Sequence, residues 1–208
     1  SYFLWTLTQK QLAHCLFPIG SYTKPQVRVL AKKFGLPNAE KKDSQGICFL
    51  GKVTLTDFLG TYIKNQRGVI VTTNGKKIGE HSGAWQFTIG QRRGIGIGGG
   101  QPYYVAEKNV KTNTVTVASE NDPALMQKEV VLTNLNFISC PPRHFNILQN
   151  VGMSVWCRVR YRQPVAPATL QLTNSSTYKL IFHAPQRFIA PGQSAVLYTG
   201  KGEVLGGG

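Results

Sequence analysis

Apolar residues among positions 1–42 recur at the spacing of helices. One short helix is expected over residues 9–16. A second is expected to begin at Pro25, whose missing N–H is harmless in a first turn, and to end at Gly35. Its apolar stripe comprises Val27, Leu30, Ala31 and Phe34. Residues 1–42 are therefore predicted to be helical.

The pattern changes to short strands over residues 43–128, after a third short helix expected at 54–63. Asn74-Gly75 lies between two apolar runs, and Asn-Gly is the strongest short signal for a β-hairpin. The expected strand pairs are residues 68–72 with 77–80 and residues 103–106 with 114–117. This segment is predicted to be a small central β domain.

Residues 129–208 contain only strand and turn signals. The expected strands are residues 130–132, 154–161, 168–172, 179–182 and 194–198. Several short strands in such a segment favour a small closed barrel. The predicted fold class is mainly β: an N-terminal helical segment, a small central β domain and a C-terminal β-barrel.

The charge of the chain narrows the choice of partner. Lys and Arg number 24 against 9 Asp and Glu, a formal net charge of +15. Such an excess favours nucleic acid or an anionic membrane surface. No apolar run has the length of a membrane span and no signal peptide is recognisable, so we expect a cytoplasmic protein without a membrane partner.

Cys48 is the cysteine with the most reactive setting. It follows Lys41-Lys42, Asp43-Ser44 and Gly46, and nearby cations lower the pKa of a thiol and favour the nucleophilic thiolate. A buried structural cysteine remains the alternative. Three further cysteines are expected to be inert: Cys15, Cys140 and Cys157. No pair has zinc-site spacing, so no metal site is predicted.

A glycine-rich run follows Gln91, Arg92 and Arg93. Its glycines formally satisfy G-x-G-x-x-G, but no strand precedes them and Gln101-Pro102 follows where a helix should begin, so a dinucleotide site is rejected. We interpret the run as a mobile loop whose flanking polar side chains contact RNA phosphate. A plain surface turn is the alternative.

Arg158, Arg160 and Arg162 alternate along the strand expected at residues 154–161. Strand periodicity would place the three arginines on one face, at a spacing similar to that of RNA phosphates, and Tyr161 on the other. Tyr161 would then be free to stack on an unpaired base. A solvated, charged edge strand explains the same pattern.

Several of these segments together resemble the bacterial tRNA-specific 2-thiouridylases. The matching segments are Ser1–Leu4, Phe17–Gly20, Asp43–Phe49, Thr88–Arg92, Arg160–Gln163 and Pro191–Val196. The matches run in order along the whole chain and correspond to the later part of that family's length. The resemblance implies a sulfurtransferase that adenylates C2 of the wobble uridine (position 34) of tRNA and then replaces its oxygen with sulfur.

The resemblance also assigns roles to residues. Cys48 matches the cysteine that carries a persulfide, receives sulfur from a relay protein and can close a disulfide with an earlier cysteine of the family. Arg160, Tyr161 and Gln193 match tRNA-contacting positions, and the substrate region is the anticodon loop. ATP, with Mg²⁺, would be bound by an ATP-pyrophosphatase domain whose tail is residues 1–42, so the chain alone is expected to be inactive.

Two other functions compete with this interpretation. One is a non-catalytic tRNA-binding module in which Cys48 is incidental. The other is a methyltransferase acting on the same uridine. It ranks lower because no glycine motif follows a strand to hold S-adenosylmethionine.

Overall fold

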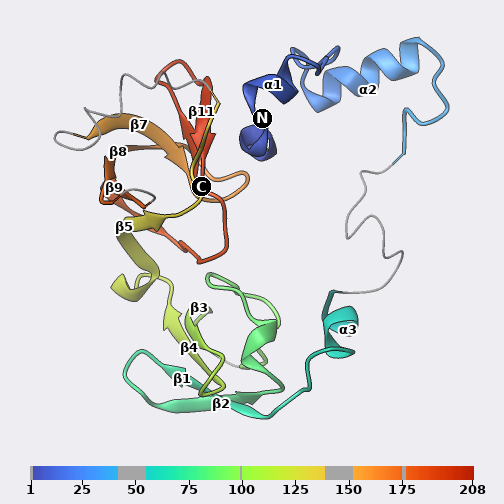
Figure 1. Ribbon diagram of the computed structural model, residues 1–208. Coiled ribbons are helices and arrows are strands. Elements are labelled where there is room, and N and C mark those ends of the chain that lie inside the picture. Colours follow the sequence, from blue (N-terminus) through green and yellow to red (C-terminus); the bar gives the residue numbers. More distant parts are fainter. Residues whose placement is uncertain (1, 42–54, 99, 139–151, 175–176) are drawn as a thin grey trace. The chain divides into compact units, whose positions relative to one another are not determined.

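A computed structural model describes residues 2–41, 55–98, 100–138, 152–174 and 177–208 (Figure 1). The chain divides into two compact units, Lys10–Lys64 and Ser1–Gln9 together with Asn65–Gly208. Among the helices of these residues, none has the length and apolar character needed to cross a membrane.

The Lys10–Lys64 unit is helical. Its elements are α1 (Gln9–Leu12, begun in the other unit), α2 (Lys24–Lys33) and α3 (Leu55–Gly60). The Thr23 N–H donates to Gln26 Oε1 at 2.8 Å at the start of α2, and Pro25 lies in the first turn, as predicted. The first helix is shorter than expected, because the His14 N–H bonds to the Gln11 carbonyl three residues back and tightens the last turn.

The central segment forms a four-stranded sheet with the order β2-β1-β4-β3. Its strands are β1 (Gly68–Thr72), β2 (Lys77–His81), β3 (Tyr103–Asn109) and β4 (Thr114–Ser119), with the 3₁₀ turn η2 (Ala84–Gln86) between β2 and β3. Both predicted hairpins are confirmed, and β1 and β4 pair in parallel. The core contains Ile70, Ala84, Phe87, Ile95, Val105, Val115 and Val117.

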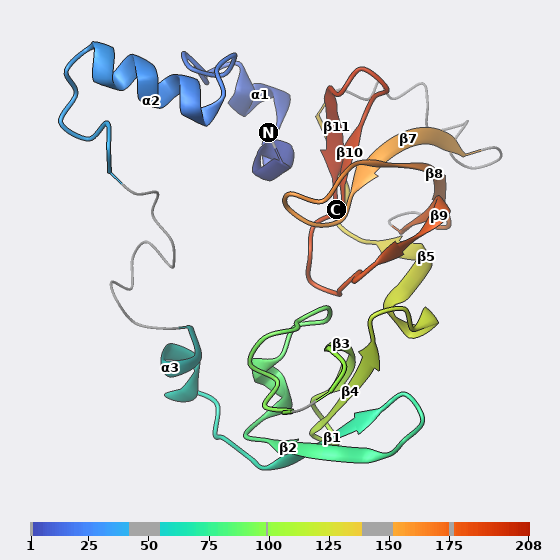
Figure 2. The same ribbon diagram turned by 180° about the vertical axis from the view of Figure 1, so that it is seen from behind.

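The C-terminal segment forms a seven-stranded sheet with the order β5-β9-β8-β7-β10-β11-β6. Its elements are η3 (Pro123–Leu125), β5 (Met126–Leu132), β6 (Asn136–Phe137), β7 (Met153–Arg158), β8 (Ala166–Leu172), β9 (Tyr178–Arg187), β10 (Val196–Tyr198) and β11 (Val204–Gly207). The two edge strands, β5 and β6, are separated only by Thr133–Leu135, so the sheet must curl until its edges approach (Figure 2). The predicted mainly β fold with a C-terminal barrel is confirmed.

The first residues of the chain pack on this barrel. Tyr2 and Trp5, in the 3₁₀ helix η1 (Tyr2–Thr6), cover Val196 and Tyr198 on its outer surface. The Tyr2 hydroxyl donates to the Ser194 carbonyl at 2.7 Å, and Asn136 Nδ2 donates to the Trp5 carbonyl at 2.6 Å. A segment expected only to be helical therefore completes the outer surface of the barrel.

Candidate nucleic-acid interface

The arginines at 158, 160 and 162 do not form one strand face, and this prediction was wrong. β7 ends at Arg158, and a turn follows in which the Gln163 N–H donates to the Arg160 carbonyl at 3.1 Å. Arg162 has a φ of 69°, the left-handed conformation typical of the third residue of such a turn. Pro164 is the signal that could have ended the strand in the prediction, since its ring removes a ladder donor.

Arg160 joins the barrel to the loop that precedes Gly90. Its Nη2 donates to the Ile89 carbonyl, and its guanidinium lies 6.0 Å from the centre of the Phe188 ring. Burial lowers the pKa of Arg160 from its ordinary value, which reflects the cost of holding this charge away from water. The residue predicted to contact RNA therefore also has a structural role.

A stacked pair of rings lies beside Arg160. Tyr104 and Phe188 are 5.3 Å apart between centres, at an interplanar angle of 25°. The Arg187 guanidinium lies 4.7 Å from the Phe188 ring centre and 5.7 Å from that of Tyr104, and Arg92 lies 6.0 Å from the Tyr104 ring. Such cation–π contacts orient guanidiniums. Arg187 is held further, because its Nη2 also donates to the Glu120 carbonyl at 2.5 Å.

Arg187 and Phe188, which lie beside Arg160 in the structure, were not singled out from the sequence. The expected strand at 179–182 stopped short of them, whereas β9 continues to Arg187. The available signal was a basic residue next to an aromatic one, Arg187-Phe188, a few residues before the turn at Pro191-Gly192.

Two exposed rings extend this surface. Tyr161 is 55% exposed and Phe3 is 67% exposed, and their ring centres are 5.0 Å apart. The Arg162 guanidinium lies 5.4 Å from the Tyr161 ring. An adjacent hollow of about 580 Å³, which we call the turn pocket, is lined by Met126, Arg160–Gln163 and Pro185–Phe188. Exposed rings beside cations are the features that hold unpaired bases and their phosphates.

The side chain of Gln91 closes its own loop. Its Oε1 accepts from the Thr88 N–H at 3.0 Å, and its Nε2 donates to the Arg93 carbonyl at 2.9 Å. Ile95 is buried in the core of the four-stranded sheet, so the glycine run is anchored there. Arg92 and Arg93 remain exposed and free to meet phosphate, whereas Gln91 serves to shape the loop.

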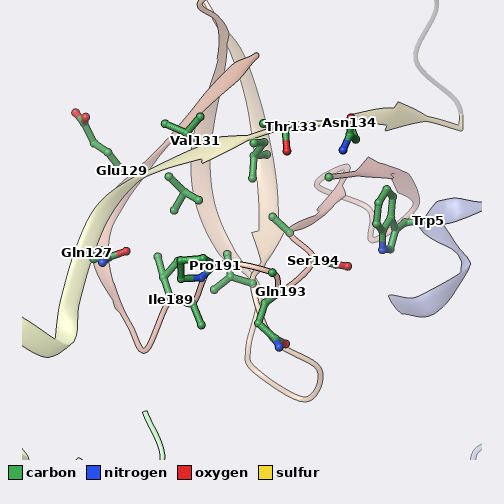
Figure 3. Close-up of a pocket in the computed structure, with 17 residues that line it drawn as sticks. Trp5, Gln127, Glu129, Val131, Thr133, Asn134, Ile189, Pro191, Gln193 and Ser194 are labelled. Atoms are coloured by element: carbon green, nitrogen blue, oxygen red, sulfur yellow. The ribbon is translucent and has the colours of Figure 1, made fainter. Parts of the chain in front are cut away.

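Gln193 lies in the loop between β9 and β10. This loop and β5 enclose a pocket of about 500 Å³, with Trp5 at one end (Figure 3). Figure 3 shows the Gln193 side chain directed away from β5. Gln193 also lines a hollow of about 400 Å³ with Ile89 and Lys108, so it lies near the loop that Arg160 holds.

Cys48 lies outside the described residues. Cys157 is buried in the barrel core, and burial raises its pKa to about 12, which favours the weakly nucleophilic thiol form at neutral pH. Cys15 is partly exposed, and its thiol donates to the Gln11 carbonyl at 3.3 Å. Within the described ranges, no group of three or more His, Cys, Asp or Glu side chains is placed to hold a metal ion.

Three family models match successive parts of the chain. They are described as the tRNA methyl transferase HUP domain (residues 1–52), the tRNA methyl transferase PRC-barrel domain (residues 56–119) and the aminomethyltransferase beta-barrel domain (residues 127–208). The second and third coincide with the two sheets. These matches place the chain in the class of proteins that combine these three domains.

Curated relatives make the class specific. Proteins named tRNA-specific 2-thiouridylase MnmA are 43% identical in Tolumonas auensis and 42% identical in Salmonella typhimurium and Shigella flexneri. Each alignment covers 100% of this chain and 56% of the relative. The chain belongs to the MnmA-type tRNA-specific 2-thiouridylase family, as the sequence motifs predicted, and spans about half the length of these relatives.

Proposed function

We propose that this chain is part of an enzyme that 2-thiolates the wobble uridine of tRNA. The observation that carries the proposal is identity above 40% along the whole chain to proteins named 2-thiouridylase. The surface around Tyr161 and Arg162 supports it independently, because it offers exposed rings and guanidiniums to single-stranded RNA. The anticodon loop of tRNA is single-stranded RNA of this kind, with unpaired bases and accessible phosphates.

In the proposed reaction Cys48 carries the transferred sulfur. The uridine O2 attacks the α-phosphorus of ATP and pyrophosphate leaves. The terminal sulfur of the Cys48 persulfide attacks C2, and AMP departs with the former uridine oxygen. A second cysteine thiolate then attacks Cys48 Sγ, closing a disulfide and leaving the sulfur on the base. The lysines at 41 and 42 would favour the anionic forms of this sulfur.

The remaining participants are assigned by chemistry. ATP and Mg²⁺ would be held by the HUP domain of the whole enzyme, of which the matched residues 1–52 are one part. The persulfide requires a sulfur-relay protein as donor, and a reduced thiol together with tRNA suits the cytoplasm. On this proposal the 208-residue chain alone binds tRNA but does not thiolate it.

A methyltransferase is the second candidate, because two of the family models carry that name. The curated relatives, matched along the whole chain, are named for thiolation instead. Mass spectrometry of nucleosides from modified tRNA separates the two, since 2-thiouridine and a methylated uridine differ in mass.

The direct test is the persulfide. The chain would be incubated with a cysteine desulfurase and cysteine, and its peptides would be analysed by mass spectrometry under non-reducing conditions. We expect one added sulfur on the Cys48 peptide and none on that of Cys157. In a protein of the relatives' full length, Cys48→Ser should abolish 2-thiouridine formation while tRNA binding persists. Unchanged thiolation would support a binding module with an incidental cysteine.

A further inference from the structure

A further hollow lies on the outer face of the barrel, beside β7 and β10. It encloses about 490 Å³ and we call it the β7 pocket. Its lining comprises Trp156, Arg158, Val165, Tyr198, Thr199, Gly200 and Gly202. None of these residues lines the turn pocket, although the same connection from β7 to β8 borders both.

Strand periodicity explains why aromatic and basic side chains lie together at this pocket. Val155 and Cys157 point into the barrel core, so Trp156 and Arg158 of the same strand point outward. Tyr198 on β10 is paired directly opposite Trp156. Cross-strand neighbours on one face lie within side-chain contact, so two rings and a guanidinium come together there.

The polar groups of the β7 pocket are not satisfied within the protein. The Nε of Arg158 and the hydroxyl of Tyr198 are shielded from solvent, and no residue in the described parts of the chain hydrogen-bonds either atom. Native proteins rarely leave such atoms unpaired. The Arg158 guanidinium lies 5.8 Å from the Tyr198 ring centre, a contact that orients it but leaves its Nε without an acceptor.

Trp156 supplies an apolar surface at the same position. Its side chain is 40% exposed, unusual for the largest aromatic residue on a barrel strand. An indole face with solvent access next to a fixed guanidinium matches a nucleotide, in which a planar base is joined to a phosphate. A free phosphate would use the arginine alone and leave the indole without a function.

We propose that the β7 pocket binds an unpaired nucleotide of RNA, with its base stacked on Trp156 and its phosphate on Arg158. The assignment rests on the proposed function, since it makes the pocket a second contact for the tRNA that occupies the turn pocket. Arg158 and Arg160 are two residues apart, so one strand of RNA can reach both pockets.

Tryptophan fluorescence tests the assignment in the 208-residue chain. The protein has three tryptophans, and replacing Trp5 and Trp85 by phenylalanine leaves Trp156 as the only reporter. We expect titration with single-stranded oligouridylate to quench this emission. Trp156→Ala should weaken binding between about fivefold and about a hundredfold, the usual loss of one stacked base, and Trp156→Phe should restore part of it. Arg158→Gln should reduce the salt slope of binding by about one.

Tyr62→Ala is the matched control, because Tyr62 is also an exposed ring but lies in the helical unit. This variant should bind RNA as tightly as the parent chain does. Unchanged Trp156 emission with tRNA bound, together with full affinity of Trp156→Ala, would overturn the assignment and leave the proposed function standing. If the unmodified chain fails to bind tRNA at all, the proposed function fails too.

Discussion

Arg160 permits a test that separates structural from RNA-binding roles. Replacing it with methionine keeps the length of the side chain but removes the charge and the hydrogen bond to the Ile89 carbonyl. A hydrogen bond from a charged donor contributes about 1.5–3 kcal/mol, and the contact with Phe188 about 0.5–1 kcal/mol more. Relief of guanidinium burial, which the lowered pKa of Arg160 reflects, offsets part of this loss.

We therefore expect Arg160→Met to lower the free energy of unfolding by about 1–3 kcal/mol. Urea denaturation followed by circular dichroism would measure it. Limited proteolysis should also cut faster within the glycine run that follows Ile89, since the bond that fixes this loop is gone.

Arg162→Met is the matched control. Arg162 has the same charge and lies in the same turn, but it is exposed and contacts the Tyr161 ring rather than a backbone carbonyl. Its loss should change the free energy of unfolding by less than about 0.5 kcal/mol and reduce the salt slope of RNA binding by about one. Equal stabilities of the two variants would refute the structural role assigned to Arg160.

Three further outcomes follow from the packing. Gly90→Ala should destabilise the chain by about 1–3 kcal/mol in thermal unfolding, because an added Cβ would lie 2.6 Å from Phe188; Gly96→Ala, which shares the φ of 79° but faces open space, should cost less. Native Cys157 should resist iodoacetamide at pH 8 because burial raises its pKa to about 12, and it should react once denatured; alkylation at a free thiol's rate would contradict this. Burial lowers the pKa of His81, so on acidification the unfolded chain takes up this proton before the folded chain does. The free energy of unfolding should therefore fall as the pH drops below about 6.5. His81→Gln should flatten this pH dependence in urea titrations.

Local signals predicted the elements that local interactions determine. The Asn74-Gly75 hairpin and the helix beginning at Pro25 are both present, because turn geometry and capping depend on residues close in sequence. The mainly β fold followed from the same short-range patterns. Non-local pairing was not predictable in this way: β6 and β11, each only a few residues long, exist because the barrel brings them together.

The candidate site also has features that the sequence predicted and features that it did not. Arginine and tyrosine at 158–162 were recognised by residue type, but their geometry depends on a turn rather than on strand alternation. Phe3 and Phe188 were missed because their contacts with Tyr161 and Arg160 join segments far apart in the chain. Residue chemistry is readable from sequence, whereas the partner of each side chain depends on the tertiary fold.

The proposed interface combines cations that are held by the protein with cations that are exposed, and the two kinds should affect RNA binding differently. Arg160 is fixed by a carbonyl and a ring and has already lost most of its side-chain entropy. A phosphate that reaches it therefore meets an oriented guanidinium at little further cost in entropy. Arg162 and Arg93 are exposed, and their charges act at longer range in solution, where salt screens them. Free cations should thus govern the rate of RNA association, and held ones the dissociation rate and register.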